Sequence, residues 1–139
     1  MDGRAARIMV IEDDHDLMRL ITHTLTAAGF QVIQAYGGQD GLRKVRLSRP
    51  DLILTDLAMP QMSGVEVIQR VKSDPQTEPI PCVAVTAFMW DSIAQCAGQA
   101  GCDSYLPKPF NAVRLLQEVA KYVALPAKLS ARADAANRA

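Results

Sequence analysis

Carboxylate side chains follow two separate apolar runs of the sequence, at the point where each run ends. Asp56 comes directly after the apolar residues 52–55, and Pro60 and Gly64 break the chain just beyond it. The acidic residues 12–14 follow the apolar residues 8–11 in the same way. If both runs are buried strands, their carboxylates can reach the same edge of a sheet. Such an arrangement is typical of a site for a metal ion, a phosphoryl group or both.

The composition predicts one compact domain and excludes several classes of protein. A chain of 139 residues lies within the usual size of a single domain. The formal net charge is zero and the pI is about 6.7, so there is no basic surplus for binding nucleic acid or a membrane surface. No apolar run approaches the ~20 residues that span a bilayer, and residues 1–7 lack the apolar core of a signal peptide. We therefore expect a cytoplasmic protein with no direct nucleic-acid or membrane contact.

The cysteines and histidines do not indicate a further reactive site. Cys82, Cys96 and Cys102 are odd in number and lack the spacing of metal ligands, which favours reduced thiols. Cys82 lies in an apolar run and is expected to be a small buried hydrophobe. His15 and His23 are not next to a cysteine in sequence, and both are expected on the surface of the first helix.

Strand patterns alternate with helical patterns five times along the chain. The expected strands cover residues 8–11, 31–35, 52–55, 82–85 and 104–106. The expected helices cover residues 17–28, 38–47, 65–73, 93–100 and 113–123. Asn111 is the expected N-cap of the last helix, in which Val113, Leu116, Ala120 and Val123 share one apolar face.

Five strand–helix units imply a doubly wound α/β fold with a five-stranded parallel sheet, because right-handed crossovers place helices on both faces. The common strand order is 2-1-3-4-5, and ligands bind where the order reverses, between the first and third strands. Those two strands end near Asp13 and Asp56. The topology rule and the carboxylate positions therefore indicate the same site. Residues 74–81 contain three prolines and are expected to form a loop.

Four motifs occur in order at the carboxyl ends of the expected strands. They are the acidic pair Glu12-Asp13, the pattern Asp-x-x-Met-Pro-x-x-x-Gly beginning at Asp56, Val-Thr-Ala around Thr86, and Lys-Pro-Phe beginning at Lys108. In combination they resemble the receiver (CheY-like) domain of bacterial response regulators, over roughly residues 7–123. CheY is itself an example of the 2-1-3-4-5 order, so the fold prediction and the resemblance are not independent. We expect an N-terminal lead at residues 1–6, a receiver domain at 7–124 and a frayed or disordered tail at 125–139.

The resemblance implies a phosphoacceptor and a magnesium site. Asp56 would attack phosphorus and become an aspartyl phosphate. Asp13 and Asp56 would bind Mg²⁺ directly, Glu12 would hold one of its water ligands, and the backbone carbonyl of Ala58 would complete the protein ligands. A divalent cation is needed because carboxylates alone would repel an incoming phosphate.

The resemblance also implies two further phosphate contacts and a conformational switch. Lys108 would pair with phosphoryl oxygens as a point charge, and Thr86 would donate its hydroxyl group to another. Tyr105 would be the switch aromatic, changing its exposure as Thr86 moves toward the phosphoryl group. The Lys108–Pro109 bond is a candidate cis peptide.

As a receiver, the protein would accept its phosphoryl group from a sensor histidine kinase or a histidine phosphotransfer protein. It would not be an enzyme and would promote only its own Mg²⁺-dependent phosphorylation and dephosphorylation. A downstream protein partner would bind at the fourth helix, fifth strand and fifth helix, and a phosphorylation-dependent homodimer is a further expectation. The apolar loop 88–90, which contains Trp90, either packs onto the fourth helix or forms part of a partner or dimer surface.

Several alternative interpretations remain open at this point. Acidic residues after a strand often cap the next helix, and Asp14 and Asp16 are expected to do so. A phosphatase of the haloacid dehalogenase type also uses an aspartate after a strand, but Ala58 stands where its second acid would be. A flavodoxin would need a hydroxyl- and glycine-rich loop in place of the acidic residues 12–14. The chain is also compatible with a receiver excised from a hybrid kinase or a transcription factor.

Overall fold

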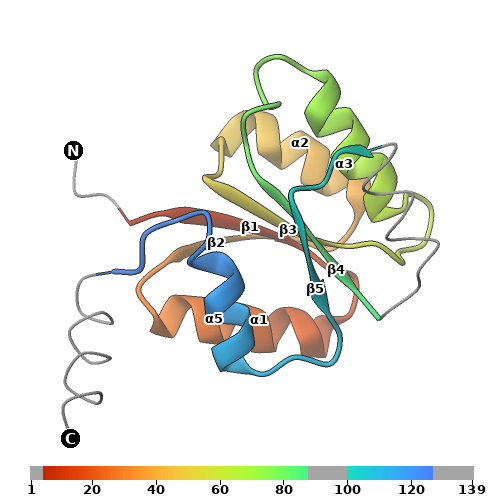
Figure 1. The fold of residues 1–139 in the computed structure, drawn as a ribbon. Coiled ribbons are helices and arrows are strands. Elements are labelled where there is room, and N and C mark those ends of the chain that lie inside the picture. The colour runs from red at the N-terminus through yellow and green to blue at the C-terminus, as the bar shows by residue number, and fades with distance from the viewer. Residues whose placement is uncertain (1–4, 88–99, 127–139) are drawn as a thin grey trace, which may run out of the picture.

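The fold consists of alternating strands and helices in the order that the sequence predicts. A computed structural model of the protein describes residues 5–87 and 100–126 (Figure 1). The strands within these ranges are β1 (Arg7–Ile11), β2 (Gln31–Ala35), β3 (Leu52–Asp56), β4 (Cys82–Thr86) and β5 (Ser104–Pro107). The helices are α1 (His15–Ala27), α2 (Gly38–Ser48), α3 (Gly64–Ser73) and α5 (Ala112–Val119). The predicted helix at 93–100 and the loop at 88–90 fall almost wholly outside the described residues.

The five strands form one parallel sheet in the order β2-β1-β3-β4-β5, which confirms the predicted topology. Helices α1 and α5 cover one face of this sheet, and α2 and α3 cover the other (Figure 1). Ile11 pairs with Thr55, so the residues that follow β1 and the last residue of β3 lie at the same edge. The order of strands reverses at this pair, where ligands bind in doubly wound folds.

The core lies in two layers because successive residues of a strand point to opposite faces of the sheet. In β1, Ile8 and Val10 pack toward α1 and α5, whereas Met9 and Ile11 pack toward α2 and α3. Gly41 allows α2 to lie close to β1, because a Cβ atom there would be 2.5 Å from Cδ1 of Ile11. The described part of the chain has no helix that is long and apolar enough to cross a membrane.

Side-chain caps define where three helices begin. The carboxylate of Asp14 accepts hydrogen bonds from the backbone N–H groups of Asp16 and Leu17 and caps α1. Asp16 lies in the first turn and donates to Asp14, so the prediction that Asp16 is also a cap was wrong. Ser63 caps α3, and Asn111 caps α5 as predicted.

The buried face of α5 differs from the apolar face that the sequence indicated. Leu115, Glu118 and Val119 are the buried residues, whereas Val113 is 64% exposed and the helix ends at Val119. Leu116 and Val123 are partly buried against the same core, so only part of the predicted face was correct. The observed rotation places Glu118 against Ser104 of β5, a polar contact that the apolar pattern could not indicate.

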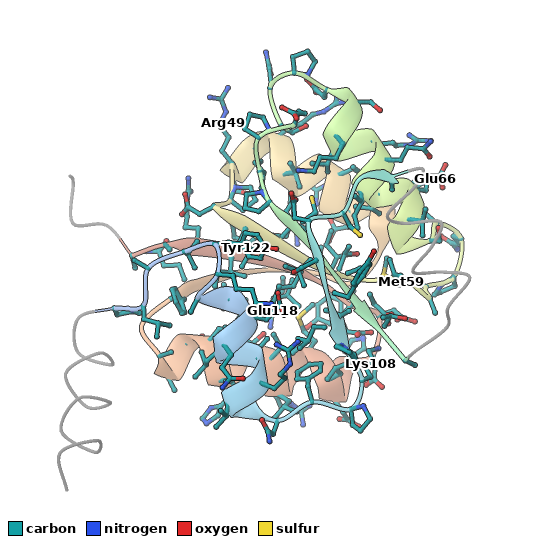
Figure 2. All side chains as sticks on the ribbon, viewed as in Figure 1. Arg49, Met59, Glu66, Lys108, Glu118 and Tyr122 are labelled. Carbon is teal, nitrogen blue, oxygen red and sulfur yellow. The ribbon has the colours of Figure 1, made fainter. Side chains whose placement is uncertain are left out.

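Glu118 is fully buried on α5 (Figure 2). Of its three partners, Ser104 lies on β5, whereas Arg114 and Lys121 are neighbours along the chain. The carboxylate of Glu118 accepts hydrogen bonds from Ser104 Oγ at 2.5 Å, Arg114 Nη1 at 2.9 Å and Lys121 Nζ at 3.1 Å. Burial acts to raise the pKa of Glu118, but these three hydrogen bonds outweigh it and keep the pKa below its usual value. The ionised form is therefore the one that stabilises the folded state.

We expect Glu118→Gln to destabilise the protein at neutral pH by about 1–3 kcal/mol, because two cations lose their charged acceptor. Because the pKa of Glu118 is lower in the folded than in the unfolded state, its ionised form stabilises the fold at pH values above the unfolded-state pKa. This stabilisation is lost as the pH falls through the folded-state pKa. The difference between the two proteins should therefore narrow below about pH 4. Urea unfolding of both proteins at several pH values measures this difference in the free energy of unfolding. Glu66→Gln removes an exposed ion pair to Arg70 and should cost less than about 0.5 kcal/mol; an equal cost for both variants would contradict the prediction.

Candidate functional site

Three carboxylates meet at the carboxyl edge of the sheet, as the sequence predicted. One carboxylate oxygen from each of Glu12, Asp13 and Asp56 lies within 4.8 Å of the others. Glu12 and Asp13 directly follow β1, and Asp56 is the last residue of β3. The parallel register of β1 and β3 therefore brings together residues that are more than forty positions apart in the sequence.

Lys108 reaches the same site from the loop after β5 (Figure 2). Its Nζ atom lies 3.0 Å from Oδ2 of Asp56 and 3.3 Å from Oε1 of Glu12. Two backbone groups also contact the carboxylates: the N–H of Ala58 donates to Oδ1 of Asp56 at 3.1 Å, and that of Asp14 donates to Oε2 of Glu12 at 3.0 Å. The cluster is thus held by one cation and two oriented amides.

Burial and neighbouring charges shift the pKa values of Glu12 and Lys108. Glu12 is 2% exposed, and its burial together with the charge of Asp56 raises its pKa to about 7, against the lowering effects of the Asp14 N–H and Lys108. Burial acts to lower the pKa of Lys108, but the carboxylates of Asp56 and Glu12 outweigh it and raise the pKa. The lysine is therefore held as a cation between the two acids.

The loop between β3 and α3 is folded tightly against the end of β3. A Cβ atom at Gly64 would lie 2.0 Å from the backbone oxygen of Asp56, so only glycine fits there. The N–H of Gly64 donates to the carbonyl of Leu57 at 3.0 Å, and Met62 is buried beneath the loop. From the sequence, the motif glycine was interpreted as a chain breaker and as one of the residues that shape the loop carrying the Ala58 carbonyl. The structure shows that it also sets how closely the loop approaches Asp56.

Thr86 and Tyr105 lie on the two strands beyond β3. Thr86 ends β4 and is buried, and its carbonyl accepts a hydrogen bond from the N–H of Lys108 at 2.6 Å. Tyr105 is half-buried on β5, where it packs against the core on the α2–α3 face and is paired with Ala84. The Lys108–Pro109 peptide bond is cis, as expected.

The two histidines and Cys82 lie outside this cluster. His15 and His23 are exposed on α1, and the ring of His15 stacks on that of Tyr36 with centroids 4.5 Å apart. Cys82 is buried, and burial raises the pKa of its thiol to about 12, which makes it an inert core residue as predicted. Cys96, like residues 88–90, lies outside the described residues.

The donor atoms of the cluster are suited to a hard divalent cation. All three side chains offer carboxylate oxygens, which suit Mg²⁺, Ca²⁺ or Mn²⁺ better than softer metals that prefer nitrogen or sulfur. Two of the three carboxylates are buried, so a cation there would also relieve unfavourable charge repulsion. The residues therefore fit a metal site.

Comparison with known proteins identifies the class of protein to which this fold and site correspond. The sequence profile of the response regulator receiver domain matches residues 8–120. The chain therefore belongs to the response regulator receiver domain family, whose members accept a phosphoryl group in two-component signalling.

Individual relatives agree with this assignment. The chain is 34% identical over 116 residues to the polar-differentiation response regulator DivK of Brucella anthropi, a match that covers 84% of this chain and 94% of the relative. The chemotaxis response regulator CheY4 of Vibrio cholerae has a similar structure, with a TM-score of 0.81 and 28% identity over 86% of this chain and all of CheY4.

A second similar structure contains a metal ion. It is the receiver domain of a sensor histidine kinase from Pseudomonas aeruginosa PAO1, with a TM-score of 0.78 and 26% identity over 86% of this chain and 98% of that one. That structure is described with a magnesium ion coordinated in the active site cleft.

Proposed function

We propose that Asp56 is the residue that accepts the phosphoryl group. The observation that carries this proposal is the position of its carboxylate, which is 5% exposed at the end of β3 and is held between the Lys108 ammonium and two further carboxylates. One oxygen of Asp56 would attack phosphorus and form an acyl–phosphate bond, while the bond from phosphorus to the donor breaks. The electron pair of that bond leaves with the donor group.

The metal of the site is proposed to be Mg²⁺. Asp13 and Asp56 would bind it directly, Glu12 would hold a water ligand, and the carbonyl of Ala58 would complete the protein ligands. Magnesium supplies positive charge that offsets the repulsion between the incoming phosphate and these acids. The clustering of three carboxylate oxygens supports this proposal.

Lys108 and Thr86 are proposed to bind phosphoryl oxygens. Lys108 already lies 3.0 Å from Asp56, so its ammonium group can follow the negative charge when the carboxylate becomes an acyl phosphate. Thr86 ends the neighbouring strand, and its hydroxyl would donate to a second oxygen. These contacts orient the group without forming a covalent bond.

Intact-mass spectrometry after incubation with a small phosphodonor and Mg²⁺ tests the proposed function. We expect the mass of one phosphoryl group, stable in acid and labile in base, located by peptide mapping in the fragment that contains Asp56. Incorporation without added divalent metal at the same rate, or on another residue, would contradict the proposal.

The phosphoryl donor is proposed to be a sensor histidine kinase or a histidine phosphotransfer protein in the cytoplasm. The only reactions proposed for the protein itself are its own phosphorylation and dephosphorylation. The signal would leave through a surface that includes β5 and α5, together with the predicted fourth helix, toward a downstream protein or a second copy of the chain.

The aspartyl phosphate should be hydrolysed slowly. Hydrolysis needs a water molecule in line with the acyl–phosphate bond, and the exposed methyl group of Ala58 cannot orient one. Phe88, the second position after Thr86 in sequence, would also leave the water without a polar partner. Ala58→Asn combined with Phe88→Glu should accelerate loss of the phosphate by about tenfold, which is about 1.4 kcal/mol in the barrier. Phosphate release measures the rate, and an unchanged lifetime would contradict the argument.

Thr86 and Tyr105 are proposed to couple the site to the output surface. If Thr86 moves toward the phosphoryl group, Tyr105 can turn into the space that it leaves. We expect phosphorylation of the parent protein to change the fluorescence of Trp90. Thr86→Ala should still accept phosphate but lose this change, together with any phosphorylation-dependent partner binding or dimerisation. Equal responses in Thr86→Ala and the parent protein would show that the coupling runs through other residues.

A further inference from the structure

The side chain of Met62 is buried although it lies in the loop between β3 and α3. It is 7% exposed, whereas its neighbours Pro60, Gln61 and Ser63 are exposed. It packs into the core layer between the sheet and the helices α2 and α3. Met62 therefore anchors the second half of this loop, and the first half carries Ala58.

Gly38, the first residue of α2, leaves the space that Met62 fills. The helices α2 and α3 lie side by side on this face of the sheet (Figure 1). A Cβ atom at Gly38 would be 2.9 Å from both Cγ and Sδ of Met62, and 2.9 Å from Cγ2 of Val67 on α3. A side chain at position 38 would therefore displace one of these two residues. The backbone of Gly38 is not in the left-handed region, so the glycine is required for space and not for conformation.

The loop is closed in such a way that a shift of Met62 reaches Ala58. The N–H of Gly64 donates to the carbonyl of Leu57 at 3.0 Å, which joins the two ends of the loop. The N–H of Ala58 donates to Oδ1 of Asp56 at 3.1 Å. Because closely packed groups pass small displacements to their neighbours, the position of Ala58 depends on how Met62 is seated.

The position of Ala58 matters because its carbonyl is a proposed ligand of Mg²⁺. This ion needs near-octahedral ligation at about 2.0–2.1 Å and tolerates little displacement of a ligand. Asp56 is fixed by the sheet, where it pairs with Val85 of β4. Ala58 lies outside the sheet, so the loop and its anchor determine where its carbonyl lies.

We infer that Met62 is a positioning residue for the metal site. Its side chain, seated against Gly38 and Val67, holds the loop so that the Ala58 carbonyl and the Asp56 carboxylate can bind one cation. This role rests on the proposed function of Asp56 and on the proposed magnesium site. A merely structural Met62 would contribute to stability but would not affect the Mg²⁺ affinity of the folded protein.

Calorimetric titration with Mg²⁺, at a temperature where every variant is folded, tests this role. Met62→Ala should weaken Mg²⁺ binding by at least about fivefold, because loss of a group that supports a ligand commonly costs about 10–100-fold. Met62→Leu keeps a side chain of similar volume and should bind Mg²⁺ within about twofold of the parent. In Met62→Ala the Mg²⁺ concentration for half-maximal phosphorylation should rise by the same factor, with the rate at saturating Mg²⁺ within about twofold of the parent.

Met18→Ala separates this role from a general loss of packing. Met18 is fully buried on α1, in the other core layer. Its replacement by alanine should lower the thermal midpoint, because it leaves a cavity, but should leave the Mg²⁺ affinity within about twofold of the parent.

The two neighbouring glycines at the start of α2 provide a second, matched comparison. Gly38→Ala should weaken Mg²⁺ binding by about threefold, because β-branched Val67 is stiff and Met62 is the side chain that yields. Gly37→Ser places its side chain at the N-cap, where no atom lies within 4 Å of the added Cβ, and should bind Mg²⁺ like the parent.

The inference is overturned if Met62→Ala and Gly38→Ala bind Mg²⁺ like the parent, or if Met18→Ala weakens binding as much as Met62→Ala does. The titration of the parent protein distinguishes this failure from failure of the proposed function. If the parent itself binds no Mg²⁺, the proposed metal site is wrong and the role of Met62 is wrong with it.

Discussion

Asp56→Asn should abolish stable phosphorylation of the protein by a small phosphodonor. The asparagine side chain has nearly the same shape and can still accept the hydrogen bond from the N–H of Ala58, which is 3.1 Å from Oδ1 of Asp56 in the structure. It lacks the anionic oxygen that would attack phosphorus. We therefore expect complete loss of the added mass, with little loss of folded structure by circular dichroism.

Asp51→Asn provides a matched control for this variant. Asp51 immediately precedes the same strand at its opposite end, where its carboxylate accepts a hydrogen bond from the N–H of Arg7. This variant should incorporate phosphate like the parent protein. Labelling that persists in Asp56→Asn, or that maps to His15, would show that another residue is the acceptor.

Asp13→Ala should have the second-largest effect, by removing a proposed metal ligand. Changes in groups that only support a ligand commonly cost 10–100-fold in metal affinity, so loss of a direct ligand should weaken Mg²⁺ binding by at least about tenfold. Phosphorylation that depends on Mg²⁺ should be lost with it. The metal-free variant should be at least as stable as the parent, because one of three crowded negative charges has been removed.

Titration calorimetry with Mg²⁺ and thermal unfolding in a chelator measure the two parts of this prediction. Asp14→Asn is the control, because asparagine also caps a helix and the substitution removes a charge next to the site without removing a proposed ligand. It should bind Mg²⁺ within a fewfold of the parent. A large loss of metal-free stability in Asp13→Ala would instead indicate that Asp13 is mainly a structural hydrogen-bonding residue.

The architecture of this protein was determined by patterns that are local in the sequence. Runs of four apolar or β-branched residues predicted β1, β3 and β4, because central strands of a parallel sheet are buried on both faces. Alternation of polar and apolar residues predicted β2. The prolines of residues 74–81 and the capping residue Asn111 act within a few positions of themselves, so their effects could be predicted directly. The strand order and the meeting of Asp13 with Asp56 then followed from the general rule for doubly wound sheets.

The rotation of α5 was decided only by tertiary contacts. Its sequence offers apolar residues around much of the helix, and Val113 fits the pattern as well as Val119 does. The buried face is the one that brings Glu118 to Ser104 of β5, while Arg114 and Lys121, its neighbours along the chain, supply positive charge to the buried carboxylate. Hydropathy alone would place a glutamate on the exposed side.

The close packing around the site also depends on the folded chain. Gly64 is required because the carbonyl of Asp56 lies beside it, a contact that the sequence pattern could not distinguish from an ordinary turn. Local pattern therefore determined which elements form, because it reflects burial and capping within a few residues. Tertiary structure decided which side chains face each other, because that depends on helix rotation and close contacts between distant parts of the chain.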